Sequence, residues 1–128
     1  MARAWHRDAL KGLSAPNPAF VGNLRGDAVD AELRTYQVHI GSALGTPPAK
    51  VADELRAFER RLVAAVTALD ERYPVGAELE TDGLLAVTDL AGWAHAEWVR
   101  IHPFANGNGR TARLWANYLL ARAMDCRR

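Results

Sequence analysis

The sequence has little of several features that mark common protein classes. It is 128 residues long with one cysteine, Cys126, which excludes an internal disulfide and favours a reducing compartment. No apolar run approaches the ~20 residues that a membrane-spanning helix needs, and no secretory signal is found. Internal repeats and low-complexity tracts are also absent. These absences favour a cytoplasmic protein without a membrane partner.

The charge balance shows no strong bias toward either sign. Sixteen basic and 15 acidic residues give a formal net charge of +1 at pH 7. Nucleic-acid-binding domains usually carry a marked basic excess, so we expect no nucleic-acid partner. The hydrophobic content of 49% and the charged content of 24% are ordinary for a globular domain of this length.

One segment near the C-terminus holds an unusual mixture of residue types: residues 102–113 read HPFANGNGRTAR. Gly107 and Gly109 allow backbone conformations that other residues avoid, and they leave room for a ligand. Their amides, with a helix start near Gly109, would form a concave set of donors for an anion. Arg110 and Arg113 lie three apart on one face of the first helical turn. Because the guanidinium fork binds phosphate oxygens bidentately, the segment predicts a phosphate site.

A histidine opens this segment. His102 precedes Pro103, where a helix is expected to stop, so its side chain should project from a helix end toward the turn. With an unperturbed pKa of about 6.5, an imidazole is the natural general base at neutral pH. A lone histidine at a helix end is more often a cap or a packed residue. Its occurrence beside the glycine turn and the arginine pair favours catalysis instead.

Two other nucleotide-binding motifs do not fit. Residues 107–112 formally match the dinucleotide fingerprint G-x-G-x-x-[G/A]. That fingerprint needs a preceding strand and a βαβ unit, whereas the preceding segment here has a helical pattern. No G-x-x-x-x-G-K-[ST] segment is present, so the protein is not a P-loop nucleotide-binding protein.

The hydrophobic periodicity predicts a mainly α fold with one small β element. An irregular N-terminal arm should cover residues 1–24. The expected elements are short helices near 4–10 and 27–33, a strand at 36–40 that opens a hairpin, and long helices at about 49–72, 82–101 and 110–124. Asp82 is the expected cap of the second long helix. Its apolar face should begin with Leu84, and that of the last helix should include Leu114, Tyr118 and Ala121 on one stripe beside Trp115 and Leu119.

Residues 102–113 closely resemble the signature of the Fic (filamentation induced by cAMP) domain family, H-P-F-x-[D/E]-G-N-G-R-x-x-R. The similarity extends over about residues 25–124, and it implies a Fic-like helical bundle with a β-hairpin flap at residues 25–128. In that family the flap docks a target segment by main-chain pairing. The corresponding residues here are Val38, His39, Ile40 and Gly41.

The resemblance implies an enzyme that transfers AMP from ATP to a serine, threonine or tyrosine hydroxyl of a target protein. His102 would remove the hydroxyl proton, and Phe104 would anchor the loop in the core. The phosphates would be bound by the amides around Gly107, Asn108 and Gly109, by Arg110 at the β-phosphate and by Arg113 at the γ-phosphate.

One position departs from the family signature. Asn106 stands where a carboxylate usually holds the Mg²⁺ that bridges the phosphates, and a neutral amide is a weaker ligand for this hard cation. Three alternatives stay open: weak Mg²⁺ binding mostly through ATP, transfer of another phosphate-containing group, or a nucleotide- or partner-binding module that catalyses poorly. No Cys/His set suggests another metal site, and His6 and His39 have no evident partner.

Many Fic proteins are held inactive by a helix with the pattern [S/T]-x-x-x-E-[G/N]. Residues 67–72 begin like this pattern, but Arg72 replaces the small residue, so we interpret the match as chance. A separate small antitoxin is then the expected regulatory partner, and the protein would act as a toxin.

Overall fold

The structure is a computed structural model that describes residues 1–74 and 77–125; Cys126 lies outside this range. Its elements are α1 (Ala2–Ala9), a 3₁₀ turn η1 (Pro18–Phe20), α2 (Ala31–Thr35), β1 (His39–Ile40), β2 (Ala43–Leu44), a 3₁₀ turn η2 (Pro48–Lys50), α3 (Val51–Arg72), α4 (Thr81–Ile101) and α5 (Asn108–Asp125). The expectation of a mainly α fold with a β-hairpin is confirmed. Among the described residues, no helix is both long and apolar enough to cross a membrane.

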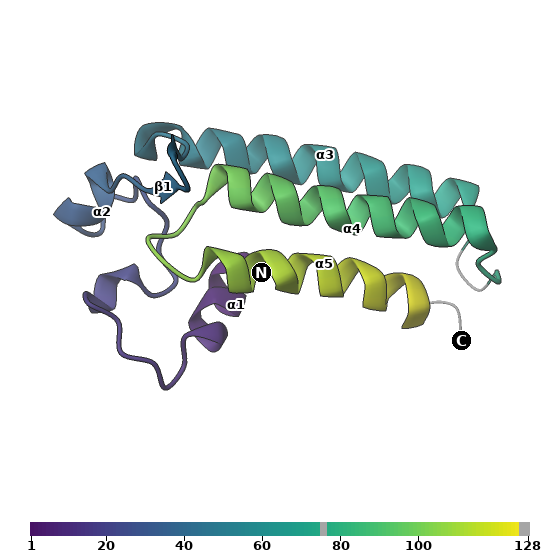
Figure 1. The fold of residues 1–128 in the computed structure, drawn as a ribbon, viewed down its shortest axis with the longest axis horizontal. Helices are drawn as coiled ribbons and strands as arrows, with labels where there is room; N and C mark the ends of the chain where they lie inside the picture. Colours follow the sequence, from purple (N-terminus) through teal and green to yellow (C-terminus); the bar gives the residue numbers. More distant parts are fainter. Residues whose placement is uncertain (75–76, 126–128) are drawn as a thin grey trace.

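Three long helices form the body of the molecule. The helix α4 packs against both α3 and α5, and α1 packs against α5 (Figure 1). The short helix α2 and the hairpin gather at one end of the bundle, where α4 leads into α5 (Figure 1). The loop between α4 and α5, where the motif begins, therefore lies at the same end as the hairpin.

Aromatic side chains dominate the core. Trp98 lies with its ring centroid 5.5 Å from Phe58 and 5.7 Å from Trp115. Phe104 is 0% exposed, so its expected role as an anchor of the motif loop in the core is confirmed. Burial of each such side chain contributes about 1.5–3 kcal/mol, and this packing fixes where the motif loop leaves α4.

The helix starts differ in detail from the sequence predictions. The helix α3 begins at Val51 rather than near residue 49, because Pro48–Lys50 form a 3₁₀ turn first. Asp82 does not cap α4: the N-cap is Glu80, which makes no side-chain cap hydrogen bond, and Asp82 lies inside the first turn. A carboxylate there still interacts favourably with the positive end of the helix dipole.

The predicted buried faces of α4 and α5 also need correction. Trp115 and Leu119 of α5 are buried as predicted, together with Ala112 and Ala123, whereas Tyr118 of the predicted stripe is 41% exposed. In α4, Leu84 is 52% exposed, whereas the later apolar residues Val87, Ala91, Ala94, Trp98 and Ile101 are buried. Apolar residues occur around much of α5, so its pattern allowed two stripes. Contact with α4 selected the one that includes Trp115.

The N-terminal segment contains the short helix predicted near residues 4–10, displaced toward the N-terminus by one or two residues. Its helix α1 covers Ala2–Ala9, and Trp5 packs edge-on against Trp115 at a centroid distance of 4.9 Å. The short helix α2 begins later than predicted, because the Asp30 side chain accepts hydrogen bonds from the amides of Glu32 and Leu33. The division of the chain at residue 24 stays a prediction.

The hairpin is shorter than the predicted strand. Only His39–Ile40 and Ala43–Leu44 are strands, paired with His39 opposite Leu44 and Ile40 opposite Ala43. Gly41 has φ +63°, the left-handed conformation that a tight two-residue hairpin loop needs at its first position. Residues 36–38 stay outside the strand, although the Val38 carbonyl accepts a hydrogen bond from the Gly45 amide at 2.9 Å.

Candidate active site

His102 ends α4 in a conformation that is rare for its residue type. It has φ 52° and ψ 58°, and among the described residues it alone has a positive φ without being glycine. A left-handed conformation costs a non-glycine residue about 1–2 kcal/mol, so surrounding contacts must maintain it. The His102 amide donates to the Trp98 carbonyl at 2.9 Å, and its own carbonyl accepts from Arg25 at 2.7 Å.

The contacts of the His102 imidazole suit a general base. Its Nδ1 atom lies 3.1 Å from the Val99 carbonyl, which can only accept, so Nδ1 carries the proton. The Nε2 atom of this tautomer keeps its lone pair. Partial burial lowers the pKa of His102, the Val99 carbonyl opposes this shift, and the positive charge of Arg25 adds to the lowering. The imidazole is therefore neutral at physiological pH and able to accept a proton.

The side chain of Asn108 shapes the motif loop. It is almost fully buried: its Oδ1 accepts from the Phe104 amide at 2.9 Å, and its Nδ2 donates to the Phe104 carbonyl at 2.7 Å. Both polar atoms of the amide are thus used within the loop. Any contact of Asn108 with a phosphate would come from its backbone N–H.

The start of α5 presents donors and positive charge together. The helix begins at Asn108, one residue before the predicted start, and the backbone N–H groups of its first turn have no acceptor within the helix. Gly107, at φ +71°, turns the chain into this helix. Arg110 and Arg113 are exposed and form no ion pair within residues 1–74 and 77–125. These two cations remain free to bind an anion.

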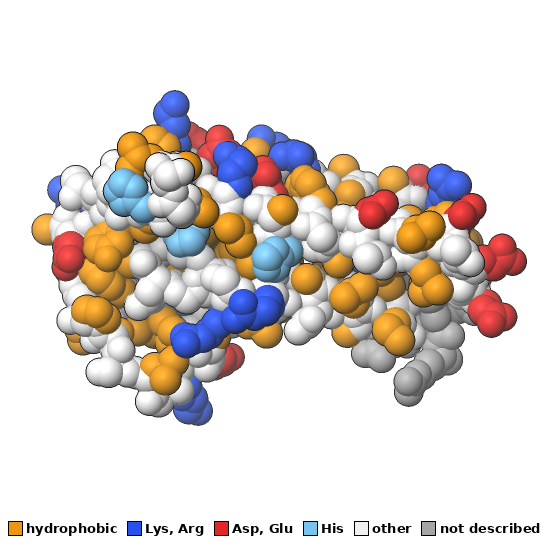
Figure 2. Space-filling view, viewed as in Figure 1, with side chains coloured by type: hydrophobic (Ala, Val, Ile, Leu, Met, Phe, Trp, Pro, Cys, Tyr) orange, Lys and Arg blue, Asp and Glu red, His pale blue; other side chains and the backbone are white. Residues whose placement is uncertain are grey.

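A cavity of about 520 Å³ lies at this helix start, and its lining joins the motif to the chain after α1. It is lined by Leu10, Leu13, Ser14, Asn106, Gly107, Gly109, Arg110 and Arg113. Figure 2 shows histidine side chains and several lysine or arginine side chains on the half of this face where α4 leads into α5. The predicted phosphate-binding residues Gly107, Gly109, Arg110 and Arg113 therefore share one hollow.

His6 of α1 hydrogen-bonds to the motif loop, a contact that the sequence did not indicate. Gly22 donates its N–H to Nδ1 of His6 at 2.9 Å, so Nε2 carries the proton and donates to the Asn106 carbonyl at 2.9 Å. The ring stacks on Phe104 at a centroid distance of 3.8 Å. Burial lowers the pKa of His6, which keeps it neutral. One hundred residues separate His6 from Asn106, so no local signal could have paired them.

Asn106 tests whether this loop could hold a metal ion. Its Oδ1 atom is buried and has no hydrogen-bond partner within the described part of the chain. The described residues also contain no group of three or more His, Cys, Asp or Glu side chains that could hold a cation. One neutral amide oxygen fits Mg²⁺ only where phosphate oxygens supply most of the ligands.

Arg25 is a second residue that sequence reasoning missed. Its side chain is 1% exposed and donates to four backbone carbonyls, those of Ile101, His102, Tyr36 and Thr46. Burial lowers the pKa of Arg25 to about 10, so the guanidinium stays charged at neutral pH. An arginine in an irregular segment gives no sequence signal of burial, because arginines are usually exposed.

The hairpin lies at the same end of the bundle as the motif, and no hydrogen bond between described residues joins it to the His102 imidazole. Val38 is buried, Ile40 is half-buried, and His39 and Gly41 are exposed, so the outer edge of β1 is open to solvent. Arg25 joins the two regions, because its carbonyl partners lie on both sides of the hairpin and at the end of α4.

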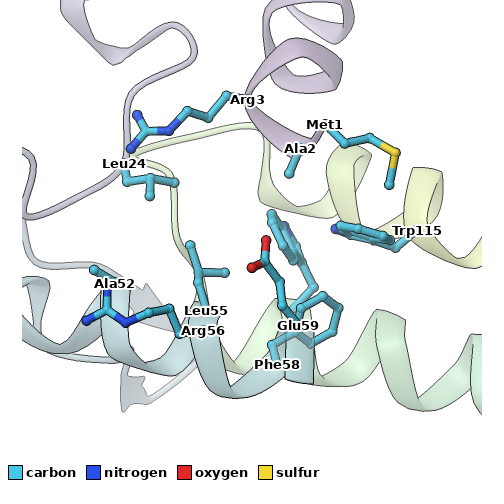
Figure 3. Close-up of a pocket in the computed structure, with 11 residues that line it drawn as sticks. Met1, Ala2, Arg3, Leu24, Ala52, Leu55, Arg56, Phe58, Glu59 and Trp115 are labelled. Atoms are coloured by element: carbon cyan, nitrogen blue, oxygen red, sulfur yellow. The ribbon is translucent and has the colours of Figure 1, made fainter. Parts of the chain in front are cut away.

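A second cavity, of about 430 Å³, lies between α1, α3 and α5 (Figure 3). Its walls are mainly apolar, with Leu55 and Phe58 reaching in from α3, and it contains no motif residue. Arg3 and Arg56 line it, but they pair with Asp27 and Asp53. The cavity therefore lacks the free cations found at the start of α5.

Comparison with known proteins agrees with this geometry. Protein adenylyltransferase Fic of Drosophila persimilis and that of Drosophila melanogaster are each 36% identical to the chain over 92 residues, or 72% of its length. The chain spans only 15% and 16% of the length of these two relatives. The Fic/DOC family model matches residues 1–120 and so includes α1, the hairpin and the motif. The chain belongs to the Fic/DOC family.

Proposed function

We propose that this protein transfers AMP from ATP to a hydroxyl side chain of a target protein. The observation that carries the proposal is a neutral histidine at the end of α4, followed in the chain by a helix start that holds two arginines. Within the described residues, Nε2 of this histidine makes no hydrogen bond and the arginines form no ion pair. A base next to an anion-binding site is what phosphoryl-group transfer to a hydroxyl requires. The adenylyltransferase names of the similar Drosophila proteins support AMP as the group.

In the proposed reaction, Nε2 of His102 takes the proton of the target hydroxyl as its oxygen attacks the α-phosphorus of ATP. The bond from that phosphorus to the bridging oxygen breaks, and pyrophosphate leaves. Arg110 and Arg113 would bind the β- and γ-phosphates, and the N–H groups at Gly107–Gly109 would stabilise the charge that develops.

The hairpin would present the target. Its β1 edge, with Val38, His39, Ile40 and Gly41, offers main-chain groups that can pair with an extended segment carrying the serine, threonine or tyrosine. This placement would bring the hydroxyl to the end of the bundle that holds His102 (Figure 1).

Mg²⁺ would be held mainly by the phosphates of ATP, with Oδ1 of Asn106 as the protein ligand. Such an ion would supply positive charge that neutralises the phosphate oxygens. A small antitoxin or an inhibitory helix that covers Arg113 would be the regulatory partner, and the protein would then act as a toxin.

The neutral residue at position 106 keeps two alternatives open. The site could transfer another phosphate-containing group, or it could bind a nucleotide or a partner with little catalysis. The missing carboxylate is the observation that motivates both.

One experiment separates the three functions. The protein is incubated with Mg²⁺, a cell lysate and ATP labelled at either the α- or the γ-phosphate. Protein-bound label from α-labelled ATP alone supports AMP transfer, and label from γ-labelled ATP alone indicates phosphate transfer. Nucleotide binding without any covalent label indicates a binding module. His102→Ala should lose the label, whereas His95→Ala, seven residues earlier on α4, serves as the matched control.

A further inference from the structure

Arg25 has an unusual environment for a buried cation. Among the contacts of the described residues it has no carboxylate partner, and its donors meet only backbone carbonyls. A buried charge is costly unless its donors find acceptors, and four of the five guanidinium N–H groups do so here, which indicates a site built around this side chain.

The four carbonyls belong to two separate parts of the chain. Those of Ile101 and His102, at 3.1 and 2.7 Å, are at the C-terminal end of α4. Those of Tyr36 and Thr46, at 3.1 and 2.9 Å, lie before β1 and after β2. The guanidinium thus spans from the catalytic end of α4 to both ends of the hairpin.

The position at the end of α4 is favourable for a cation. The last carbonyls of a helix accept no hydrogen bond within the helix. They form its negative end, where a positive charge is stabilising. The backbone N–H of Arg25 also donates to the Pro103 carbonyl at 2.8 Å, just past His102. Three consecutive carbonyls, from Ile101 to Pro103, are therefore bonded to this one residue.

We propose that Arg25 is a positioning residue: it holds His102 in its left-handed conformation and fixes the hairpin at a set place relative to the base. The proposal rests on the proposed transfer to a target that the hairpin docks. Because Arg25 is hydrogen-bonded to both regions, a target paired with β1 would be held at a fixed distance from the imidazole of His102.

The charge of Arg25 also acts on the base. It lowers the pKa of His102 in the same direction as burial does, and the Val99 carbonyl opposes both. Arg100, near the same end of α4, is exposed and paired with Glu97 and Glu54 at 2.8 and 2.5 Å. His39 of the hairpin is exposed.

The test compares Arg25→Gln, which removes the charge, with Arg25→Lys, which keeps the charge but cannot reach all four carbonyls. Arg100→Gln is the matched control, because it makes the same change two residues before His102. Two readouts need no enzymatic activity: the NMR titration of His102, assigned with His102→Ala, and amide exchange of the Gly45 N–H that closes the hairpin on Val38.

We expect Arg25→Gln to raise the pKa of His102, while Arg25→Lys and Arg100→Gln leave it near the wild-type value. Exchange at Gly45 should quicken fivefold or more in both Arg25 variants, as loss of about one hydrogen bond predicts, but not in Arg100→Gln. In the transfer assay with α-labelled ATP and lysate, the acid limb of the pH–rate profile should shift to higher pH only in Arg25→Gln.

An unchanged His102 titration in folded Arg25→Gln, or unchanged Gly45 exchange in either variant, would overturn the proposal. If Arg25→Gln does not fold, Arg25→Lys decides alone: faster Gly45 exchange supports the bridge, and wild-type exchange refutes it. Absence of any labelled protein with the wild type would reject the proposed transfer, while the two NMR readouts would still test Arg25.

Discussion

At the scale of single residues, the surroundings of His102 decide its chemistry. The Val99 carbonyl sets the tautomer, burial lowers the pKa, and the bond from Arg25 to the His102 carbonyl helps to hold the backbone in its left-handed turn. Within the described residues, Nε2 is left unprotonated and makes no hydrogen bond. The imidazole therefore has the protonation state that a general base needs before any substrate binds.

Replacement of His102 by alanine should lower transfer by about a hundredfold or more, because general bases contribute on the order of 10²–10⁴-fold to rate. Affinity for ATP should stay within a few-fold, since the base acts on the hydroxyl and not on the phosphates. Label incorporation and calorimetry with ATP measure the two effects. Wild-type transfer in His102→Ala would remove this residue from the mechanism.

Asn106→Asp tests the position that departs from the family signature. The change places a charged oxygen where Oδ1 now lacks a partner, so Mg²⁺ affinity in the presence of ATP should rise. Transfer should then reach its plateau at a lower Mg²⁺ concentration. The measurement is transfer rate against Mg²⁺ concentration, with Thr88→Asp, an exposed position on α4, as the control for added charge. Identical curves for Asn106→Asp and the wild type would show that residue 106 does not touch the metal.

At the scale of elements, the register of the hairpin shows which main-chain groups can meet a target. Bonded and non-bonded residue pairs alternate along an antiparallel ladder. The Gly45 amide bonds to the Val38 carbonyl, so the next pair, His39 with Leu44, is the non-bonded one. The N–H of His39 therefore points outward, whereas that of Ile40 points toward Ala43.

His39→Pro should therefore impair target modification, because it deletes the outward donor while the hairpin keeps its own bonds. Affinity for ATP should be retained. Ile40→Pro should disrupt the hairpin itself, and His39→Ala, which keeps the donor, should lose less activity than His39→Pro. The readouts are label on lysate protein and calorimetry with ATP. Equal loss of ATP binding in His39→Pro would assign the segment a structural role.

At the scale of the whole molecule, α1 and the segment after it complete the site. His6 bonds the loop at Gly22 to the motif at Asn106, and its ring stacks on Phe104. Removal of α1 would take away this support, as well as the contact of Trp5 with Trp115. The family match from residue 1 agrees with a site that includes this helix.

The burial of His6 and His102 predicts how stability depends on pH. Both have a pKa below the value of 6.5 that the unfolded chain would show. Above pH 6.5 both are neutral in either state, so their contribution is fully present. As the pH falls below 6.5, the unfolded state binds protons first, and the free energy of unfolding decreases.

Urea unfolding at pH 7.5 and pH 5 should show this decrease, and His6→Gln should reduce the difference between the two pH values. The pKa values of Asp27 and Glu97 are lowered from 3.8 and 4.5, so their stabilising effects are lost only at lower pH. A pH dependence in His6→Gln as large as in the wild type would show that His6 is not the group responsible.

The sequence by itself determined the parts of this protein that depend on neighbours along the chain. Local backbone geometry carries these signals. They are Pro103 after His102, the glycines of the motif and the apolar periodicity of residues 51–72 and 81–101. The mainly α fold, the order of its elements and the candidate site could therefore be predicted. Helix starts were displaced by a few residues, because capping and 3₁₀ turns compete there with little difference in energy.

Only the tertiary structure decided which distant groups support that site. His6 meets Asn106 across 100 residues of sequence, and Arg25 meets His102 across 77. Neither partner choice is encoded by spacing or periodicity, because a side-chain bond to a backbone carbonyl can be made to any residue. Packing of α1 on α5 places His6 within 3 Å of Asn106, and the bond from the Arg25 amide to the Pro103 carbonyl places Arg25 within 3 Å of His102. The cost of leaving buried polar groups unpaired then favours these side-chain bonds.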